Sequence, residues 1–363
     1  MLGSDRNANG KDLPKRIRFR WRISLFLLLI VGLAVYIVLP RFGEFEAAIV
    51  LLESMRWWAL GLAIVSQVLS YWGSGRTLKA LAANAGEALP TGRGVLLTLA
   101  GGSLSLVAGG QLAAAAAIDH WARAMGLKAE GAFLTGWFPA FFNAVALAVS
   151  ALLGAASLLM LHELPAGILA TLGFILALLI VPMAGLASTL NKPGGWKRAA
   201  RIWDATRSRV LRRKPDPAGA EAALANLRRA LLLLRQSGWK GPMAGAALNF
   251  VFDVLTLYFL FRALGHPVGP GVLLAGYGLP LLIGRFSFLP GGVGVVEGSM
   301  AGLYRALGVP ATTAVSVALA YRLLSFWLPN LAGFPVMLLL QSGWHSREPR
   351  EGPEESATGP AAA

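Results

Sequence analysis

Residues 289–298 of this chain read LPGGVGVVEG, a proline followed by four glycines within eight positions. The spacing does not fit a dinucleotide-binding GxGxxG motif, because after Gly292 and Gly294 the next glycine falls one position late, at Gly298. A Pro-Gly-Gly sequence interrupts a helix, so we expect a break here and a new helix that starts near Gly294. Glu297 would then lie in the first turn of that helix, where the helix dipole favours a carboxylate.

The chain around this break is strongly apolar. Of its 363 residues, 56% are hydrophobic and 14% are charged, against about 25% charged in ordinary soluble domains. So few polar groups cannot cover the surface of a globule of this size. The absence of cysteine rules out disulfides, thiolate metal sites and thiol nucleophiles. The composition therefore excludes a soluble enzyme, a disordered protein and a disulfide scaffold, and predicts an all-α polytopic membrane protein.

Eight apolar segments have the length of a membrane-embedded helix or hairpin. Residues 23–39 follow a basic N-terminus, 1–22, and no small-residue cleavage site follows them. We therefore expect an uncleaved first span whose N-terminus is cytoplasmic. The other segments are 57–82, 94–118, 132–161, 165–190, 242–264, 272–288 and 312–341.

The basic surplus of the chain is concentrated between two of these segments. The net charge is +15, and residues 191–240 contain thirteen basic and three acidic residues. Because basic loops of membrane proteins stay in the cytoplasm, this distribution favours a cytoplasmic loop over a nucleic-acid partner. Residues 218–235 fit an amphipathic helix on anionic headgroups, and a plain solvated basic loop fits equally well.

The number of segments between the two cytoplasmic regions is odd, so one of them cannot cross the membrane. Residues 94–118 contain two glycine pairs, Gly101-Gly102 and Gly109-Gly110, which weaken a helix interior. Broken backbone at membrane depth is tolerated where it is buried in protein or lines a watery cavity. We expect this segment to form a re-entrant hairpin and the chain to have about 6–8 transmembrane helices.

An internal repeat appears when the chain is shifted by 182 residues. Gly109-Gly110 then falls on Gly291-Gly292, and Arg123–Gly126 falls on Arg305–Gly308. The identities are few, and chance is an alternative explanation. The order of span, broken hairpin and span is the same in both repeats, about 57–161 and about 239–341. The expected topology gives them opposite orientations, as in inverted-repeat transporters, with the second hairpin entering from the outer face.

Charged residues within membrane segments are costly and are candidates for function. The partner of Arg322 is expected to be Glu297 or a lipid phosphate, and a purely structural ion pair is an equal alternative. Gly298 and Gly302 have the spacing of close helix contact. No metal site or cofactor is expected, and Ala115, the equivalent of Glu297, makes any site asymmetric. The candidate headgroup residues are Asp253, Arg285, Pro290, Gly291, Gly292, Gly294, Glu297, Tyr321 and Arg322, with Gly109, Gly110 and Gln111 as the first-repeat counterpart.

Three motifs resemble the lysylphosphatidylglycerol synthase transmembrane-region family, whose members are also known as flippase-like or UPF0104 proteins. They are PGGVGVVEG at 290–298, YRALGV at 304–309 and YRLLSFWLP at 321–329. The resemblance extends over about residues 20 to 341 and is strongest from Leu279 to Pro329. In the first half, the proline-glycine-x-glycine-glutamate segment of the family is reduced to Ala108-Gly109-Gly110-Gln111.

In bifunctional relatives a membrane flippase region precedes a cytosolic domain that transfers lysine from tRNA to phosphatidylglycerol. Here residues 23–341 resemble the membrane region, and we expect 342–363 to be a disordered cytoplasmic tail and the chain not to be an enzyme. The resemblance implies that it translocates or binds an amphiphilic lipid, such as a phospholipid, glycolipid, polyprenyl lipid or hopanoid, in the cytoplasmic (inner) membrane. The alternative is a scaffold that recruits a lipid- or envelope-modifying enzyme. With no ATP-binding motif, transport would be passive or ion-coupled.

Overall fold

The computed structural model describes residues 55–107, 110–161, 238–287 and 289–345, with single positions between 225 and 236. The expected first span 23–39, the segment 165–190 and most of the 191–240 loop lie outside the described residues. The chain divides into units 1–55 and 56–363, and the helices below belong to the second. Within the described residues the structure is helical throughout and contains no strand. The expected all-α class is confirmed.

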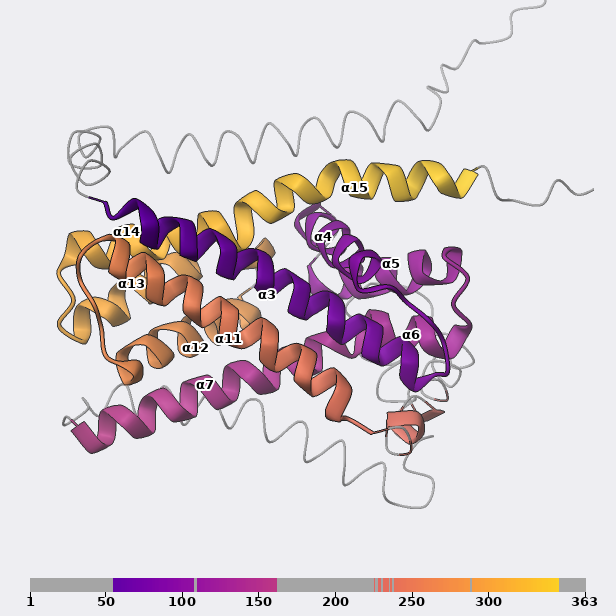
Figure 1. Cartoon of the computed structure of the whole chain (residues 1–363), viewed down its shortest axis with the longest axis horizontal. Coiled ribbons are helices and arrows are strands. Elements are labelled where there is room, and N and C mark those ends of the chain that lie inside the picture. Colours follow the sequence, from indigo (N-terminus) through magenta and orange to yellow (C-terminus); the bar gives the residue numbers. More distant parts are fainter. Residues whose placement is uncertain are drawn as a thin grey trace, which may run out of the picture. The chain divides into compact units, whose positions relative to one another are not determined.

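Several of the expected apolar segments are split into shorter elements (Figure 1). In chain order they are α3 (Trp57–Asn84), α4 (Thr91–Val107), α5 (Gln111–Ala124), α6 (Ala129–Trp137), α7 (Pro139–Leu161), α11 (Lys240–Ala263), α12 (Pro270–Phe286), the 3₁₀ turn η2 (Pro290–Gly292), α13 (Val295–Ala306), α14 (Ala311–Arg322), the π-helical turn η3 (Leu323–Trp327) and α15 (Leu328–His345). Three described stretches are long and apolar enough to cross a membrane: Ala129–Met160, Lys240–Ala263 and Ala311–Gln341. α3 has 28 residues, or about 42 Å at 1.5 Å per residue.

α3 and α11 form an antiparallel pair, side by side in Figure 1. At one end, the Arg56 amide donates to the Ala263 carbonyl at 3.0 Å. Further along, a Cβ placed on Gly245 would lie 2.6 Å from the Thr77 backbone nitrogen, and one on Gly73 would overlap the Asn249 backbone. Glycines at these crossings let the two backbones approach more closely than any side chain would permit.

Two other helices end at glycine-rich breaks. α4 ends at Val107 and α5 begins at Gln111, directly after Gly110, whose φ is +82°. After α12, it passes through η2 to Gly294, whose φ of +82° suits glycine, and α13 starts at Val295. The predicted break and helix start near Gly294 are therefore confirmed. Gly291 also has to be glycine for packing, since a Cβ there would overlap the Phe326 ring.

α7 and α15, which end the segments 57–161 and 239–341, each pack on a helix of the other segment that precedes a glycine break. α7 lies against α12, and α15 lies against α4. Each contact has a serine that donates to a backbone carbonyl across the interface: Ser150 to Leu274 at 3.0 Å, and Ser103 to Asn330 at 2.7 Å. These links satisfy polar groups that would be costly to leave unpaired in an apolar interior.

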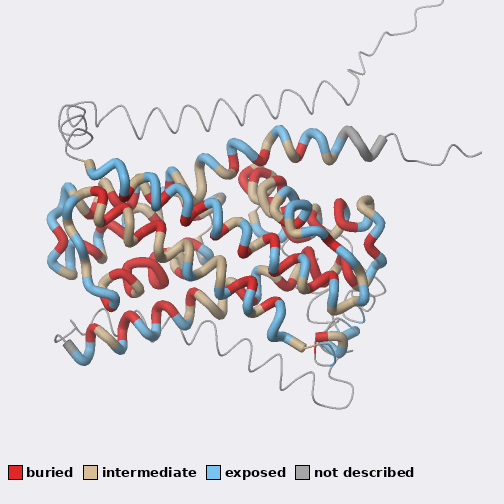
Figure 2. Tube along the Cα trace, viewed as in Figure 1, coloured by how far each residue is buried: buried red, intermediate tan, exposed pale blue. Residues whose placement is uncertain are grey.

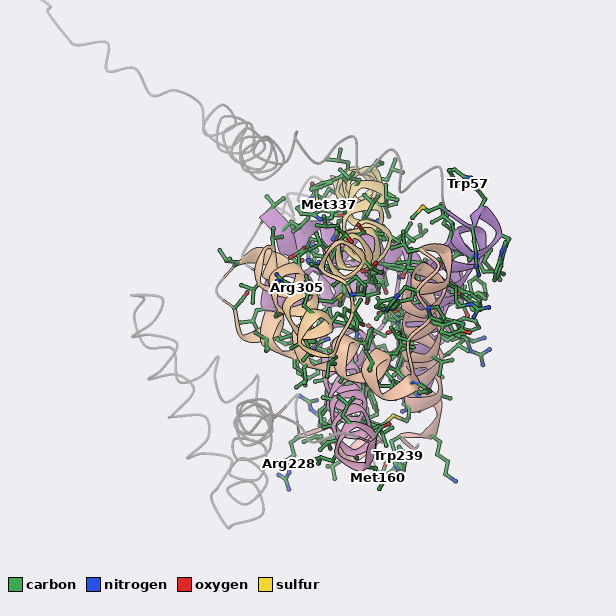
Figure 3. The ribbon with its side chains drawn as sticks, turned by 90° about the vertical axis from the view of Figure 1, so that its left-hand side faces the viewer. Trp57, Met160, Arg228, Trp239, Arg305 and Met337 are labelled. Atoms are coloured by element: carbon green, nitrogen blue, oxygen red, sulfur yellow. The ribbon has the colours of Figure 1, made fainter. Side chains whose placement is uncertain are left out.

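The outside of the bundle is apolar. Figure 2 colours the chain by burial, with buried and exposed positions alternating along the helices. Large hydrophobic residues are among the exposed ones, such as Met160, 87% exposed, and Leu339, 70% exposed. Trp57 and Met160 lie at the periphery of the bundle in Figure 3. Exposed apolar surface of this extent is not tolerated in water and is expected for a protein solvated by lipid.

One expectation about packing is wrong. Gly298 and Gly302 were expected to allow a close helix contact, but a Cβ at either position would have no neighbour within 4 Å among the described residues. Both are exposed, so they lie on the face of α13 that points away from the bundle. The four-residue spacing was correct for one helix face, but it does not specify which face is packed.

Candidate functional site

A cavity of about 680 Å³ lies between the two helix breaks. Its volume is in the range of pockets that hold small molecules, about 300–1,000 Å³. The break in the first half contributes Gly110 and Gln111, and the break in the second half contributes Gly291 and Gly292. The fold thus brings residues of both glycine breaks to one cavity. Gly109 itself lies outside the described residues.

α3 forms one wall of the cavity. Its polar residues Gln67, Ser70, Tyr71, Ser74 and Thr77 line the cavity. They recur at intervals of three and four residues, which places them on one face of a helix. Sequence reasoning missed this stripe, although its spacing was a readable signal in a segment taken as a plain span.

The ion pair of Arg322 and Glu297 joins α14 to the second break. The Arg322 Nε donates to Glu297 Oε1 at 2.7 Å, and the two side chains are 5% and 15% exposed. The other oxygen, Glu297 Oε2, accepts from the Gly294 amide at 2.7 Å, which caps the first turn of α13. Of the two partners expected for Arg322, the structure thus supplies Glu297.

A second donor of Arg322 is also engaged. One Nη donates to the Gly291 carbonyl at 2.9 Å, and the guanidinium carbon lies 3.9 Å from the Phe326 ring centroid. A guanidinium at this distance from an aromatic face is stabilised electrostatically. Arg322 therefore holds the backbone of the break as well as its carboxylate.

Arg285 is a second arginine of the cavity, with a different environment. It lines the cavity at the end of α12 and is exposed there. Its hydrogen bond is to the Ala140 carbonyl at 3.3 Å, and no ion pair to a described carboxylate forms within 4.0 Å. Its guanidinium therefore keeps donors available for a ligand in the cavity.

Asp253 on α11 gathers side chains from three other helices. Its Oδ2 accepts from the Tyr277 and Tyr321 hydroxyls, both at 2.8 Å, and its Oδ1 lies 3.5 Å from the Ser70 Oγ. Asn249 in turn donates to Ser70 Oγ at 2.7 Å. Asp253 and Tyr321 were expected in the site, whereas Tyr277, Ser70 and Asn249 were not.

A turn of π-helix follows Arg322, and the sequence explains its position. Pro329 has no amide hydrogen, so it cannot donate to the Ser325 carbonyl four residues earlier. The Tyr71 hydroxyl donates to that carbonyl at 3.0 Å. π-helical turns are rare and are frequent at functional sites. Here the turn places Ser325 and Phe326 on the cavity wall.

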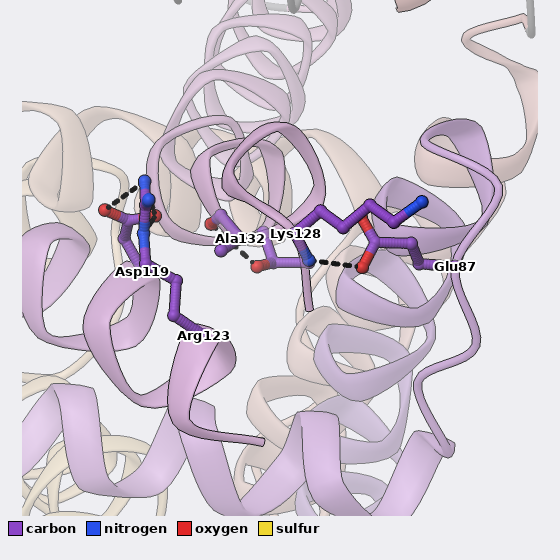
Figure 4. A network of polar contacts seen from close by, with 6 residues as sticks. Glu87, Asp119, Arg123, Lys128 and Ala132 are labelled. Atoms are coloured by element: carbon purple, nitrogen blue, oxygen red, sulfur yellow. Dashed lines mark hydrogen bonds and ion pairs between the residues drawn. The ribbon is translucent and has the colours of Figure 1, made fainter. Parts of the chain in front are cut away.

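A separate group of polar contacts lies away from the cavity (Figure 4). The Glu87 Oε2 accepts from the Lys128 amide at 2.6 Å, and the Lys128 carbonyl accepts from the Ala132 amide at 3.0 Å. Nearby, Arg123 and Asp119 form an ion pair at 3.1 Å within α5. These contacts fix the start of α6 and shape the connections between helices. They take no part in the cavity.

A helical bundle with an apolar exterior, three of whose described stretches are long and apolar enough to cross a membrane, is typical of multi-pass membrane proteins. Within that class, the model of the lysylphosphatidylglycerol synthase TM region matches residues 25–333. The chain belongs to this family.

The relatives found among curated proteins are UPF0104 membrane proteins of archaea. One from Methanothermobacter thermautotrophicus is 40% identical over 86 residues, which is 24% of this chain and 26% of that protein. One from Methanocaldococcus jannaschii is 32% identical over 106 residues, 29% of this chain and 32% of that protein. One from Pyrococcus horikoshii is 37% identical over 81 residues, 22% and 24% respectively. The chain thus matches about a quarter to a third of the length of these relatives.

Proposed function

We propose that this protein translocates an amphiphilic lipid across the cytoplasmic membrane, with the headgroup passing through the central cavity. The observation that carries the proposal is Arg285, an arginine without a carboxylate partner among the described residues, in a cavity between two helix breaks. A guanidinium binds phosphate through two parallel hydrogen bonds. Phospholipids, glycolipids, polyprenyl lipids and hopanoids all remain within the proposed class of substrates.

The proposed architecture is an inverted repeat with two re-entrant hairpins and about 6–8 spans. At the shift of 182 residues, α3, α4, α5, α6 and α7 correspond in order to α11, α12, α13, α14 and α15. α3 and its counterpart α11 are antiparallel, and α7 contacts α12 as α15 contacts α4. Exchanging the repeats leaves this set of contacts unchanged, which supports a two-fold relation between the halves.

The proposed orientation places the N-terminus and the 191–240 loop in the cytoplasm, where the loop contacts anionic headgroups. One contact supports placing the C-terminal end of α3 on the cytoplasmic side as well. The Asn84 side-chain amide donates to the Gly238 carbonyl at 3.0 Å, next to the end of that loop. Cysteines introduced at Gly86 and at His266 should therefore react with membrane-impermeant reagents from opposite sides. Labelling of Gly86 from outside would contradict the topology.

The experiment that tests the function is reconstitution of the full chain into vesicles that contain a fluorescent phosphatidylglycerol or a fluorescent glycolipid. The protein should expose inner-leaflet probe to a quencher added outside, and protein-free vesicles should not. A second candidate, a scaffold that recruits a lipid-modifying enzyme through the basic loop, makes a different prediction. Deletion of residues 197–214 should leave reconstituted translocation intact in a translocator, whereas a scaffold would show no translocation and would lose its partner.

A further inference from the structure

Asp253 lines the cavity but takes no part in the Glu297–Arg322 ion pair. No described lysine or arginine lies within 4.0 Å of its carboxylate, although it sits on an apolar helix in the middle of the bundle. An ionisable residue in such a place is costly and marks proton or ion pathways in membrane proteins. We propose that Asp253 binds a proton and couples lipid translocation to a proton gradient. The inference rests on the proposed function and supplies its energy source.

The two oxygens of Asp253 have different surroundings, and one of them is available to a proton. Tyr277 and Tyr321 both donate to Oδ2 at 2.8 Å, whereas the serine contact to Oδ1 is long, at 3.5 Å. The side-chain amide of Gln67 lies near enough to the carboxylate to favour its charged form. Protonation is therefore expected at Oδ1, where the fewest strong donors oppose an added hydrogen.

Gln67 is suited to both protonation states. It is 6% exposed, and its Oε1 has no hydrogen-bond partner among the described residues. In one orientation, the amide NH₂ group can donate to the ionised carboxylate. After a flip of the amide, its oxygen can accept the new O–H of the neutral acid. A buried acceptor without a partner is costly, and a carboxylic acid beside it removes that cost.

The same surroundings suit a proton better than a metal ion. Alkali and alkaline-earth ions need several oxygens whose lone pairs converge. Here the Tyr277 and Tyr321 hydroxyls direct hydrogens at Asp253, and the Asn249 amide directs one at Ser70 Oγ. These hydrogen-bond donors surround the Asp253 carboxylate. A metal ion would be repelled by their hydrogens, whereas a proton can bind the carboxylate without displacing them.

Protonation of Asp253 would affect the headgroup site through α12 and α14. Charge-assisted hydrogen bonds are roughly twice as strong as neutral ones, so the tyrosine bonds weaken when Asp253 becomes neutral. Tyr277 is on α12, which carries Arg285, and Tyr321 precedes Arg322 on α14. The proton would be taken from water at one side of the cavity and returned to water at the other side, and the carboxylate is regenerated.

The other titratable and charged groups around Asp253 come from each helix packed against it. Tyr71 on α3 is close enough to interact with both Asp253 and Arg322. In the described residues the set is Tyr71 on α3, Tyr277 and Arg285 on α12, Tyr321 and Arg322 on α14, and Glu297 on α13 through its pair with Arg322. Tyrosines stay neutral in the ordinary pH range and the ion pair is internally compensated, so Asp253 is the group expected to respond to pH.

The test uses full-length protein in vesicles with fluorescent phosphatidylglycerol, an imposed pH gradient and a pH-sensitive dye inside. For one proton per lipid, a gradient of about one pH unit should hold about a tenfold asymmetry of the probe between leaflets. The asymmetry should reverse with the gradient and vanish with a protonophore. Asp253→Asn should show neither asymmetry nor dye response, and Asp253→Glu should keep both.

A measurement independent of transport keeps the two proposals separate. The infrared difference spectrum between acidic and alkaline buffer should contain a carboxylic-acid band that Asp253→Asn removes. If wild-type protein moves lipid but ignores the pH gradient, or follows a sodium gradient instead, the proton site is wrong and the translocator stands. If the infrared band that is assigned to Asp253 is absent, the proposed proton site is also wrong. If wild-type protein moves no lipid while the band is present, the translocator fails and coupling fails with it.

Discussion

Two arginines in the same cavity differ in how far their donors are already used. Arg322 is held by Glu297, by the Gly291 carbonyl and by the Phe326 ring, and its side chain is 5% exposed. Arg285 is exposed and has one backbone acceptor at 3.3 Å. Sequence reasoning ranked both as membrane-embedded charges and put the emphasis on Arg322. The contacts shift that emphasis, because Arg322 already holds a carboxylate and a backbone carbonyl, whereas Arg285 holds one backbone carbonyl.

At Arg285, replacement by alanine should reduce the rate of probe translocation about tenfold or more, the effect of losing a charged hydrogen bond worth about 1.5–3 kcal/mol. Arg285→Lys should retain part of the activity because it keeps the charge. The midpoint of thermal unfolding in detergent should be unchanged, since the side chain is exposed. Arg123→Ala, on a surface ion pair outside the cavity, is the matched control. Equal rates for Arg285→Ala and the control would remove Arg285 from the site.

At Glu297, replacement by glutamine should lower stability. The glutamine oxygen can still cap the Gly294 amide, but the buried guanidinium of Arg322 loses its counter-charge. Breaking a buried pair in this way costs about 3–5 kcal/mol. The thermal midpoint of Glu297→Gln should fall clearly, and Glu297→Gln combined with Arg322→Met should be less damaged than the two single losses together suggest. Additive losses would show that the pair contributes little.

Among the helices, the pair α3 and α11 depends on glycines at its crossing. Gly73→Ala should destabilise the fold by about 1–3 kcal/mol, because its methyl group overlaps backbone that cannot rotate away. Gly61 on the same helix is the control, since a Cβ there meets nothing within 4 Å. Gly61→Ala should be neutral or stabilise by about 1 kcal/mol through helix propensity. Thermal unfolding in detergent distinguishes them, and equal midpoints would contradict the packing described.

For the helices, the sequence predicted the glycine breaks better than it predicted the contacts between helices. The Pro-Gly-Gly run specified an interruption and a helix start at Val295, because backbone preferences there are local. The π-helical turn at Leu323–Trp327 was not predicted, although Pro329 pointed to it, because the carbonyl it leaves unpaired is satisfied by Tyr71, more than 250 residues away. Gly298 and Gly302 failed for the same reason: spacing defines a face, and only the fold decides whether that face is packed.

For the whole molecule, the cavity arises from the meeting of two halves that are alike in helix order but not in charge. Ala115, equivalent in sequence to Glu297, also lines the cavity. The ion pair therefore fixes the second break, whereas no described carboxylate does the same for the first. The repeat suggested by the shift of 182 residues stays a prediction. The convergence of Asp253 with tyrosines from α12 and α14 could not be predicted from the sequence, because it depends on how the helices cross.

The central claim is that lipid headgroups pass through this cavity, and one measurement tests it most directly. The chain has no cysteine of its own, so a single cysteine can be introduced at Gln111, which is exposed on the cavity wall. Thr312→Cys, exposed at the start of α14 and outside the cavity, is the control. Translocation of fluorescent phosphatidylglycerol is measured before and after reaction with a bulky, charged thiol reagent. The account predicts that labelled Gln111→Cys loses translocation while labelled Thr312→Cys keeps it, and full activity of labelled Gln111→Cys would contradict it.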